Sequence, residues 1–230
     1  MCPIRGSLPS LINKMIIFIP IKHNSQRVHR KNLRDFGREP LFKHTLLKFK
    51  DHRVFVDTDS DEIANLIQTD SRLRTITTIK RRSELCGDKI SVCELIKDFI
   101  LRHQIREPLA QIHVTSPFLE ESTLVEAYKH IGPHDSVIAC NKHQSRFWRQ
   151  EAYGYCPVNH NPTKMEQTQD LPVLFEENSA FYIFKPEAIL GLGSRIGRNP
   201  YFYVIDKVES IDIDTEDDWN FTITMKDVLK

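Results

Sequence analysis

Short apolar runs alternate with amphipathic segments along most of the chain. Residues 15–20 and 53–57 are apolar runs of strand length, whereas residues 90–103 carry apolar side chains at helical spacing. Such alternation is typical of βαβ units, so the sequence predicts an α/β fold with a mainly parallel sheet flanked by helices. Further strands are predicted at residues 74–79, 110–114, 135–140, 180–184, 201–205 and 210–214. Further helices are predicted at residues 40–49, 59–68, 120–130 and 216–229, with Asp59 or Ser60 capping the second.

Two segments depart from this alternation. Residues 141–172 are polar and aromatic and include three prolines, which predicts an inserted arm. Residues 1–14 have no periodic pattern, and they lack the apolar stretch and cleavage site of a signal peptide. We therefore expect a loose N-terminal extension over residues 1–14 and a single domain over residues 15–230 that carries the arm.

The composition is that of an ordinary globular protein. Of the 230 residues, 40% are hydrophobic and 27% are charged, which is enough for one large core. The longest apolar runs fall far short of the roughly 20 residues that a bilayer requires, so no membrane partner is expected. The five cysteines are scattered and form no C-x-x-C pair, which favours a reduced, cytoplasmic location over a disulfide scaffold or zinc site.

A net charge of +1 conceals a strong asymmetry along the chain. Residues 1–50 contain eleven basic and two acidic residues, whereas residues 206–230 contain eight acidic and three basic ones. The basic part concentrates its charge in the loop after the first predicted strand, at Lys22, Arg27, Arg30, Lys31 and Arg34. Ligands of α/β sheets bind where strands end, and clustered cations suit a polyphosphate. The loop contains no glycine and is not a P-loop, and its charge fits a solvated loop or a nucleic-acid patch equally well.

The acidic part contains a candidate metal site. Asp212 and Asp214 alternate with isoleucines, so on a strand both carboxylates would lie on one face. Paired carboxylates beside a phosphate site are the hard oxygen ligands that Mg²⁺ prefers. Asp217 and Asp218 are more typical of a helix N-terminus, where acidic side chains offset the helix dipole.

Two other predicted strands end in polar residues. The segment of residues 56–59 contains Asp57 and Asp59, which could bind a ligand or cap the next helix. The segment of residues 113–117 offers His113, Thr115 and Ser116, which could face a ligand or form a turn at the start of a helix.

Taken in order, seven segments resemble those of the acylneuraminate cytidylyltransferase family. Residues 19–41 are similar to the family's opening I-P-A-R-x-x-S-K-x-x-x-x-K-N pattern with its later P-L, and residues 210–215 match its closing S-I-D-I-D-T. The remaining segments are V-D-T-D at 56–59, R-R-S-E-L-C-G-D at 81–88, T-S-P at 115–117, Q-D-L-P at 169–172 and N-S-A-F-Y-I at 178–183. The resemblance spans about residues 15–228.

The resemblance implies a Rossmann-like nucleotidyltransferase that joins CTP to a nine-carbon α-keto acid sugar and releases pyrophosphate. It also implies Mg²⁺ as cofactor and a homodimer in which the arm of residues 141–172 reaches the partner subunit. The implied catalytic residues are Lys31, Asp212 and Asp214, and the two aspartates would also bind the metal. The implied nucleotide-binding residues are Lys22, Asn24, Ser25, Arg27, Lys31, Asn32, Arg81 and Ser91. The implied sugar-binding residues are His113, Thr115, Ser116, Gln169, Asn178 and Tyr182.

The chain departs from the family pattern at several basic positions. Lys22 and Gln26 stand where the family has arginine and lysine, and Leu119 and Thr168 also replace basic residues. The sugar could therefore be a different 3-deoxy-2-keto acid, such as 3-deoxy-octulosonate or pseudaminate, or the chain could be a catalytically silent relative. A nucleic-acid-binding module is disfavoured, because the aromatic residues near the basic loop occupy core-like positions. The enzyme hypothesis requires the basic loop and the two aspartates to meet across one cleft.

Overall fold

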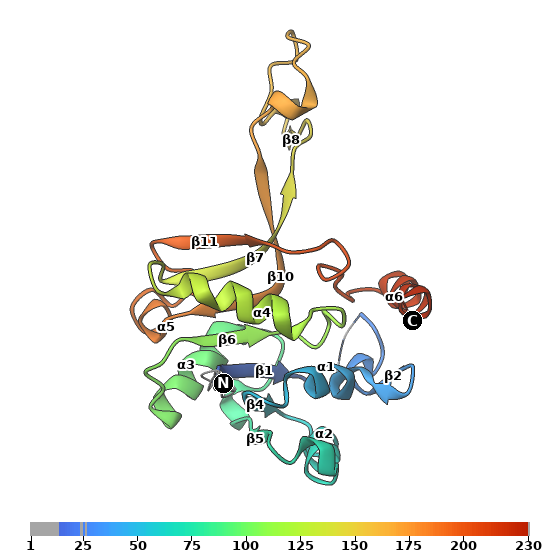
Figure 1. Cartoon of the computed structure of the whole chain (residues 1–230), viewed down its shortest axis with the longest axis vertical. Helices are drawn as coiled ribbons and strands as arrows, with labels where there is room; N and C mark the ends of the chain where they lie inside the picture. The colour runs from blue at the N-terminus through green and yellow to red at the C-terminus, as the bar shows by residue number, and fades with distance from the viewer. Residues whose placement is uncertain (1–13, 24, 26, 230) are drawn as a thin grey trace, which may run out of the picture.

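A seven-stranded sheet forms the centre of the protein (Figure 1). The computed structural model describes residues 14–23, 25 and 27–229. The sheet has the strand order β11-β7-β10-β6-β1-β4-β5, and every neighbouring pair is parallel except the two pairs that contain β10. The predicted mainly parallel α/β fold is therefore confirmed. The strands are β1 (Ile16–Ile21), β4 (Arg53–Thr58), β5 (Thr77–Lys80), β6 (Leu109–Ile112), β7 (Ser136–His143), β10 (Leu174–Phe184) and β11 (Pro200–Val204).

Helices cover both faces of the sheet, which explains why β1 is apolar at consecutive positions. Ile17 and Ile19 belong to the apolar core beneath α1, α2 and α4, whereas Ile16 and Phe18 belong to the core beneath α3 and α5. The helix α6 packs through Trp219 into a third, smaller cluster. The helices are α1 (Leu41–Phe49), α2 (Asp61–Gln68), α3 (Val92–His103), α4 (Glu121–Tyr128), α5 (Pro186–Leu192) and α6 (Glu216–Val228).

Polar side chains set where three of the helices begin. Ser60, rather than Asp59, caps α2 by accepting a hydrogen bond from the backbone N–H of Ile63. Ser91 begins α3 and Thr215 begins α6, each in a reciprocal capping box with the acidic residue three positions later. The prediction that Asp218 serves a helix N-terminus is thereby confirmed, because its carboxylate accepts the N–H of Thr215.

The prediction of a strand over residues 210–214 is wrong. Its first residues lie in a turn, where the N–H of Ser210 bonds to the carbonyl of Asp206. The segment then passes the sheet without joining it, and the N–H of Ile213 donates to the carbonyl of Thr115 at 2.9 Å. The alternating pattern arises because Ile213 is buried while Asp212 and Asp214 remain partly exposed, which requires no strand partner.

The segment after β7 leaves the body of the sheet as a projecting arm (Figure 1). It contains the hairpin of β8 (Trp148–Glu151) and β9 (Gly154–Pro157) and a 3₁₀ turn at Thr168–Asp170. Its side chains include exposed apolar groups such as Tyr153 and Met165. A second short hairpin pairs β2 (Asp35–Phe36) with β3 (Glu39–Pro40), and the sequence pattern did not predict it.

The proposed N-terminal extension lies outside the described residues except for Lys14, which is exposed. In the part of the chain that the structure describes, no helix combines the length and apolar character needed to cross a membrane.

Candidate active site

The basic loop and the acidic segment meet, although about 180 residues separate them in the chain. Arg27 donates from Nη2 to Oδ1 of Asp214 at 2.7 Å, and Nζ of Lys31 lies 3.9 Å from the same oxygen. Nζ of Lys31 also donates to the carbonyl of Ile213. The basic loop follows β1, and the acidic segment is bonded to Thr115 in the turn after β6, which pairs with β1. The predicted convergence of the two segments is confirmed.

The two cations differ in their surroundings. The Lys31 side chain is only 10% exposed, whereas that of Arg27 is 65% exposed. Burial lowers the pKa of Lys31, and the carboxylates of Asp212 and Asp214 act in the opposite direction. Lys31 is therefore a largely buried cation close to two acidic side chains, and Arg27 is an exposed partner of one of them.

Asp212 is the more buried of the two aspartates. Burial raises the pKa of Asp212, a hydrogen bond from the Thr115 side chain lowers it, and the Asp214 carboxylate raises it. Its Oδ1 is buried and lacks a hydrogen-bond partner within the described residues. A buried carboxylate oxygen without a donor is costly unless something else binds it.

A cleft of about 300 Å³ lies beside this charged cluster. Five predicted nucleotide-binding residues and two predicted sugar-binding residues contribute to its walls. The lining residues are Pro20, Lys22, Ser25, Arg27, Lys31, Asn32, Asp88, His113, Val114 and Thr115. Asn24, which the resemblance assigns to the nucleotide, and Gln26 lie outside the described residues.

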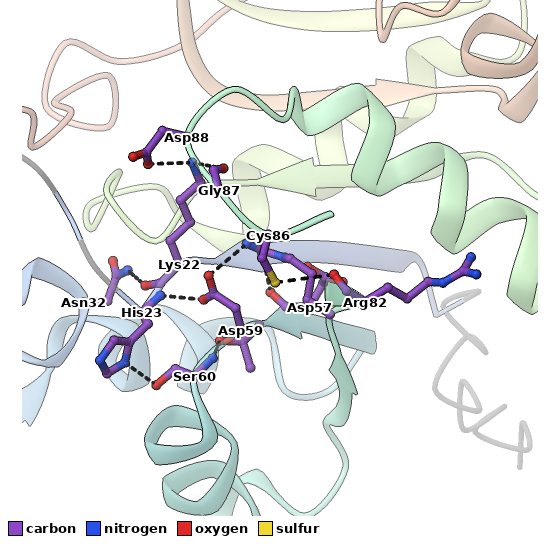
Figure 2. A network of polar contacts seen from close by, with 12 residues as sticks. Lys22, His23, Asn32, Asp57, Asp59, Ser60, Arg82, Cys86, Gly87 and Asp88 are labelled. Atoms are coloured by element: carbon purple, nitrogen blue, oxygen red, sulfur yellow. Dashed lines mark hydrogen bonds and ion pairs between the residues drawn. The ribbon is translucent and has the colours of Figure 1, made fainter. Parts of the chain in front are cut away.

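Lys22 joins the basic loop to the loop before α3 (Figure 2). Its Nζ donates to the carbonyl of Gly87 at 3.2 Å and lies 3.6 Å from Oδ1 of Asp88. The Asn32 side chain donates to the backbone carbonyl of Lys22 at 2.9 Å and holds this part of the loop in place. Asp88 therefore contributes a carboxylate to the cleft mouth that the analysis of individual residues had not singled out.

A buried ion pair lies at the end of β4, next to the basic loop. Nε of Arg81 donates to Oδ1 of Asp57 at 2.5 Å, and both side chains are almost completely buried. Burial raises the pKa of Asp57, and the ion pair with Arg81 lowers it. Nη1 of Arg81 has no hydrogen-bond partner within the described residues and lies 3.7 Å from Asp59, whose Oδ1 accepts the N–H of His23 (Figure 2). The contact of Arg81 with cytidine stays a prediction.

Ser91 and Ser116 occupy structural positions near the site. The Ser91 hydroxyl accepts the backbone N–H of Glu94 in the cap of α3, and Ser91 lies at the surface. Ser116 is buried in a turn in which its N–H donates to the carbonyl of His113. His113 itself lines the cleft, and burial together with the positive charges of Arg195 and Lys31 lowers its pKa to about 4. We therefore expect a neutral imidazole at physiological pH.

The remaining sugar-binding candidates are not gathered in the cleft of this chain. Asn178 lies on β10 and donates to the side-chain oxygen of Asn141 at 3.1 Å. Tyr182 is 1% exposed, and its hydroxyl contacts Glu177 and Ser179. Gln169 lies in the projecting arm, where its carbonyl accepts the side-chain amide of Gln144.

The donor set fits Mg²⁺. The described part of the chain contains no group of three or more His, Cys, Asp or Glu side chains placed to hold a metal ion. Mg²⁺ commonly uses only one or two protein carboxylates and takes its other ligands from water and substrate phosphates. The unsatisfied Oδ1 of Asp212 beside Asp214 supplies such a partial ligand set.

Comparison with known proteins identifies the family of this chain. Residues 16–220 match the sequence profile described as cytidylyltransferase. The chain belongs to the cytidylyltransferase family. An N-acylneuraminate cytidylyltransferase of Streptococcus agalactiae is 28% identical over 217 residues, covering 90% of this chain and 52% of the relative. A CMP-N,N'-diacetyllegionaminic acid synthase of Campylobacter jejuni is 22% identical over 233 residues, covering 94% of this chain and 97% of the relative.

The solved structures show the same fold. A CMP:2-keto-3-deoxy-manno-octonic acid synthetase complexed with CTP superposes with a TM-score of 0.63 at 12% identity, covering 94% of this chain and 100% of that one. The chain spans about half the length of the Streptococcus relative.

Two polar residues of this protein, Arg195 and Gln111, are not marked by any of the sequence motifs. Arg195 lies with its guanidinium 3.7 Å from the centre of the Tyr182 ring and donates to the side-chain oxygen of Gln111. Gln111 is completely buried on β6. A glutamine within an otherwise apolar strand is a signal that could have identified this cluster. No local pattern marks Arg195, which follows α5 in an irregular segment.

Proposed function

We propose that this protein is a nucleotidyltransferase that activates a nonulosonic, sialic-acid-like α-keto acid sugar with CTP. The products are the CMP-sugar and pyrophosphate. The observation that carries the proposal is the convergence of Lys31 and Arg27 on Asp214 beside a cleft at the carboxyl ends of parallel strands. The names of the Streptococcus and Campylobacter relatives supply the substrate class.

The triphosphate would bind to the cations of the basic loop. Lys22, Arg27 and Lys31 line the cleft, and each is paired with a carbonyl or carboxylate oxygen that a phosphate oxygen could replace. Ser25 and Asn32 also line the cleft and would contact the nucleotide, with Asn24, Arg81 and Ser91 proposed for the same role.

In the reaction, the anomeric hydroxyl of the sugar attacks the α-phosphorus of CTP. The hydroxyl loses its proton, a new O–P bond forms, and the bond to the β-phosphate breaks with release of pyrophosphate. Lys31 would stabilise the negative charge that develops on the phosphoryl oxygens, because it is a fixed cation in a largely buried position. Asp212 and Asp214 would hold Mg²⁺, which when bound supplies positive charge to the phosphates. His113 and Thr115 also line the cleft and would orient the sugar.

Leu119 bears on which sugar acid the protein uses. This residue stands where the resembling family has an arginine, and it is 1% exposed within the main core. Its position therefore offers no cation to the site, and a neighbouring residue must supply the missing charge if the sugar requires it. A 3-deoxy-2-keto acid other than N-acetylneuraminate, such as 3-deoxy-octulosonate or pseudaminate, is the second candidate substrate.

We further propose a cytoplasmic homodimer. The arm of residues 141–172 projects from the sheet (Figure 1) and carries Gln169, so a second copy could place this side chain at the cleft of its partner. The four cysteines in the described part of the chain are free, in keeping with a reduced compartment.

A substrate panel tests the proposal. Purified protein is incubated with CTP, Mg²⁺ and either N-acetylneuraminate, pseudaminate, a legionaminate or 3-deoxy-octulosonate, and pyrophosphate release is measured. Release with N-acetylneuraminate or a legionaminate supports the main proposal, and release with only pseudaminate or 3-deoxy-octulosonate supports the second candidate. CTP binding without release for any acid would overturn the enzyme proposal in favour of a silent relative.

A further inference from the structure

Arg195 covers one face of the Tyr182 ring. The two residues are stacked with the guanidinium 3.7 Å from the ring centre. Tyr182 and Gln111 face each other as register partners on β10 and β6, and Arg195 donates from Nη1 to the side-chain oxygen of Gln111. Gln111 is 0% exposed and Tyr182 is 1% exposed, so both are fixed by the surrounding core. The guanidinium is therefore held in one orientation by a ring below it and an amide oxygen at one edge.

The binding capacity of this guanidinium is largely unused. Arginine has five N–H donors, and one hydrogen bond from Arg195, to Gln111, is found among the described residues. No ion pair of Arg195 with a carboxylate occurs in the same part of the chain. The acidic residue of this cluster, Glu177, instead accepts the hydroxyl of Tyr182. A half-buried, pre-oriented arginine without a counter-ion is well suited to bind a carboxylate with two parallel hydrogen bonds.

Arg195 is also close to the cleft. Its partner Gln111 lies two residues before His113, on the same face of the chain that continues from β6. His113 lines the cleft and feels the positive charges of both Arg195 and Lys31. The imidazole is therefore close enough to interact with both cations.

We infer that Arg195 binds the carboxylate of the sugar acid and selects acids over uncharged sugars. The inference rests on the proposed function and names the residue that would bind the acid group of the substrate. In a 2-keto acid sugar the carboxylate is attached to the anomeric carbon itself. A fixed guanidinium on that carboxylate would orient the anomeric hydroxyl toward the α-phosphorus, so Arg195 would contribute to both affinity and orientation.

The experiment compares acid and ester substrates in two variants. The substrate is the panel acid that reacts fastest, or N-acetylneuraminate if none reacts, together with its methyl ester at the same carboxyl group. Arg195→Gln removes the charge and keeps a polar side chain, and Arg198→Gln is the matched control from the same segment, with an exposed side chain. Pyrophosphate release gives kcat/KM for each substrate, calorimetry gives the affinity for each, and melting curves verify the fold.

Wild-type protein and Arg198→Gln should prefer the acid to the ester by about 10- to 100-fold, which corresponds to hydrogen bonds to a charged group. Arg195→Gln should weaken binding of the acid by a similar factor, leave the KM for CTP unchanged and bring the preference close to one. Arg195→Lys should recover part of the preference, because it restores the charge without the fork.

An unchanged preference in Arg195→Gln, or no preference in the wild type, would overturn the inference. The proposed function fails separately if no acid releases pyrophosphate. In that case, an acid preference in calorimetry that depends on Arg195 would still support the inference.

Discussion

Replacing Lys31 with methionine should separate its electrostatic role from its structural one. Methionine keeps the length of the side chain and removes the charge. Folding should suffer little, about 1 kcal/mol, because the lost hydrogen bond to the Ile213 carbonyl is offset by removal of a buried ammonium. Burial already lowers the pKa of Lys31, which shows that the folded protein disfavours the charge there. The rate should fall by about 10²- to 10³-fold, the usual effect of removing one fixed donor to a developing oxyanion.

The control for this substitution is Arg27→Met. Arg27 contacts the same aspartate oxygen, but its side chain is 65% exposed and screened by water. An exposed ion pair contributes about 0–1 kcal/mol, so this variant should melt like the wild type and lose less than about tenfold in rate. Pyrophosphate release at saturating substrates measures kcat, and calorimetry measures CTP binding. A Lys31→Met defect no larger than that of Arg27→Met, or one confined to CTP affinity, would refute the reasoning.

Three further substitutions test other parts of the site. Asp212→Asn should abolish Mg²⁺-dependent pyrophosphate release. Its melting temperature should equal or exceed that of the wild type, because burial disfavours the charged carboxylate. Unchanged activity in a Mg²⁺ titration would show that Asp212 is not a metal ligand. Ser179 has a φ of 61°, a left-handed backbone conformation that glycine adopts without strain. The free energy of unfolding of Ser179→Gly should therefore exceed that of Ser179→Ala by about 1 kcal/mol. Equal urea midpoints for the two variants would contradict backbone strain at this residue. The pKa of His113 is lowered to about 4, so between pH 6.5 and 4 the unfolded chain binds a proton at this residue and the folded chain does not. The free energy of unfolding should therefore decrease as the pH falls through that range. His113→Gln should reduce the slope of unfolding free energy against pH by nearly one proton, measured by urea titrations at several pH values.

Much of the framework could be predicted because it depends on local patterns. The strand at residues 15–20 was identified by an apolar run, and β1 has that composition since helices bury both of its faces. The place of the basic loop followed from a rule about where strands end, and its convergence with Asp214 followed from charges of opposite sign and the family resemblance. These inferences needed no knowledge of which strands are neighbours.

The error at residues 210–214 has a physical cause. An alternating pattern reports which side chains are buried, not whether the backbone pairs with a strand. Ile213 is buried in a small cluster with Trp219, while the backbone makes one hydrogen bond to the turn at Thr115. The two aspartates are placed toward the basic loop by this tertiary contact rather than by a sheet.

The antiparallel insertion of β10 between β6 and β7 is what hides the cluster of Arg195, Tyr182 and Gln111 from the sequence. Because β10 runs opposite to its neighbours, its early residues, including Asn178, lie at the edge where the other strands end. Ligand-binding residues of a parallel sheet are expected just after each strand, but the segment after β10 is α5. The expectation therefore fails for this strand. The chain then returns, and Arg195 packs over Tyr182 against a glutamine that belongs to β6. Local periodicity cannot specify strand order, so a side-chain cluster created by that order becomes visible only in three dimensions.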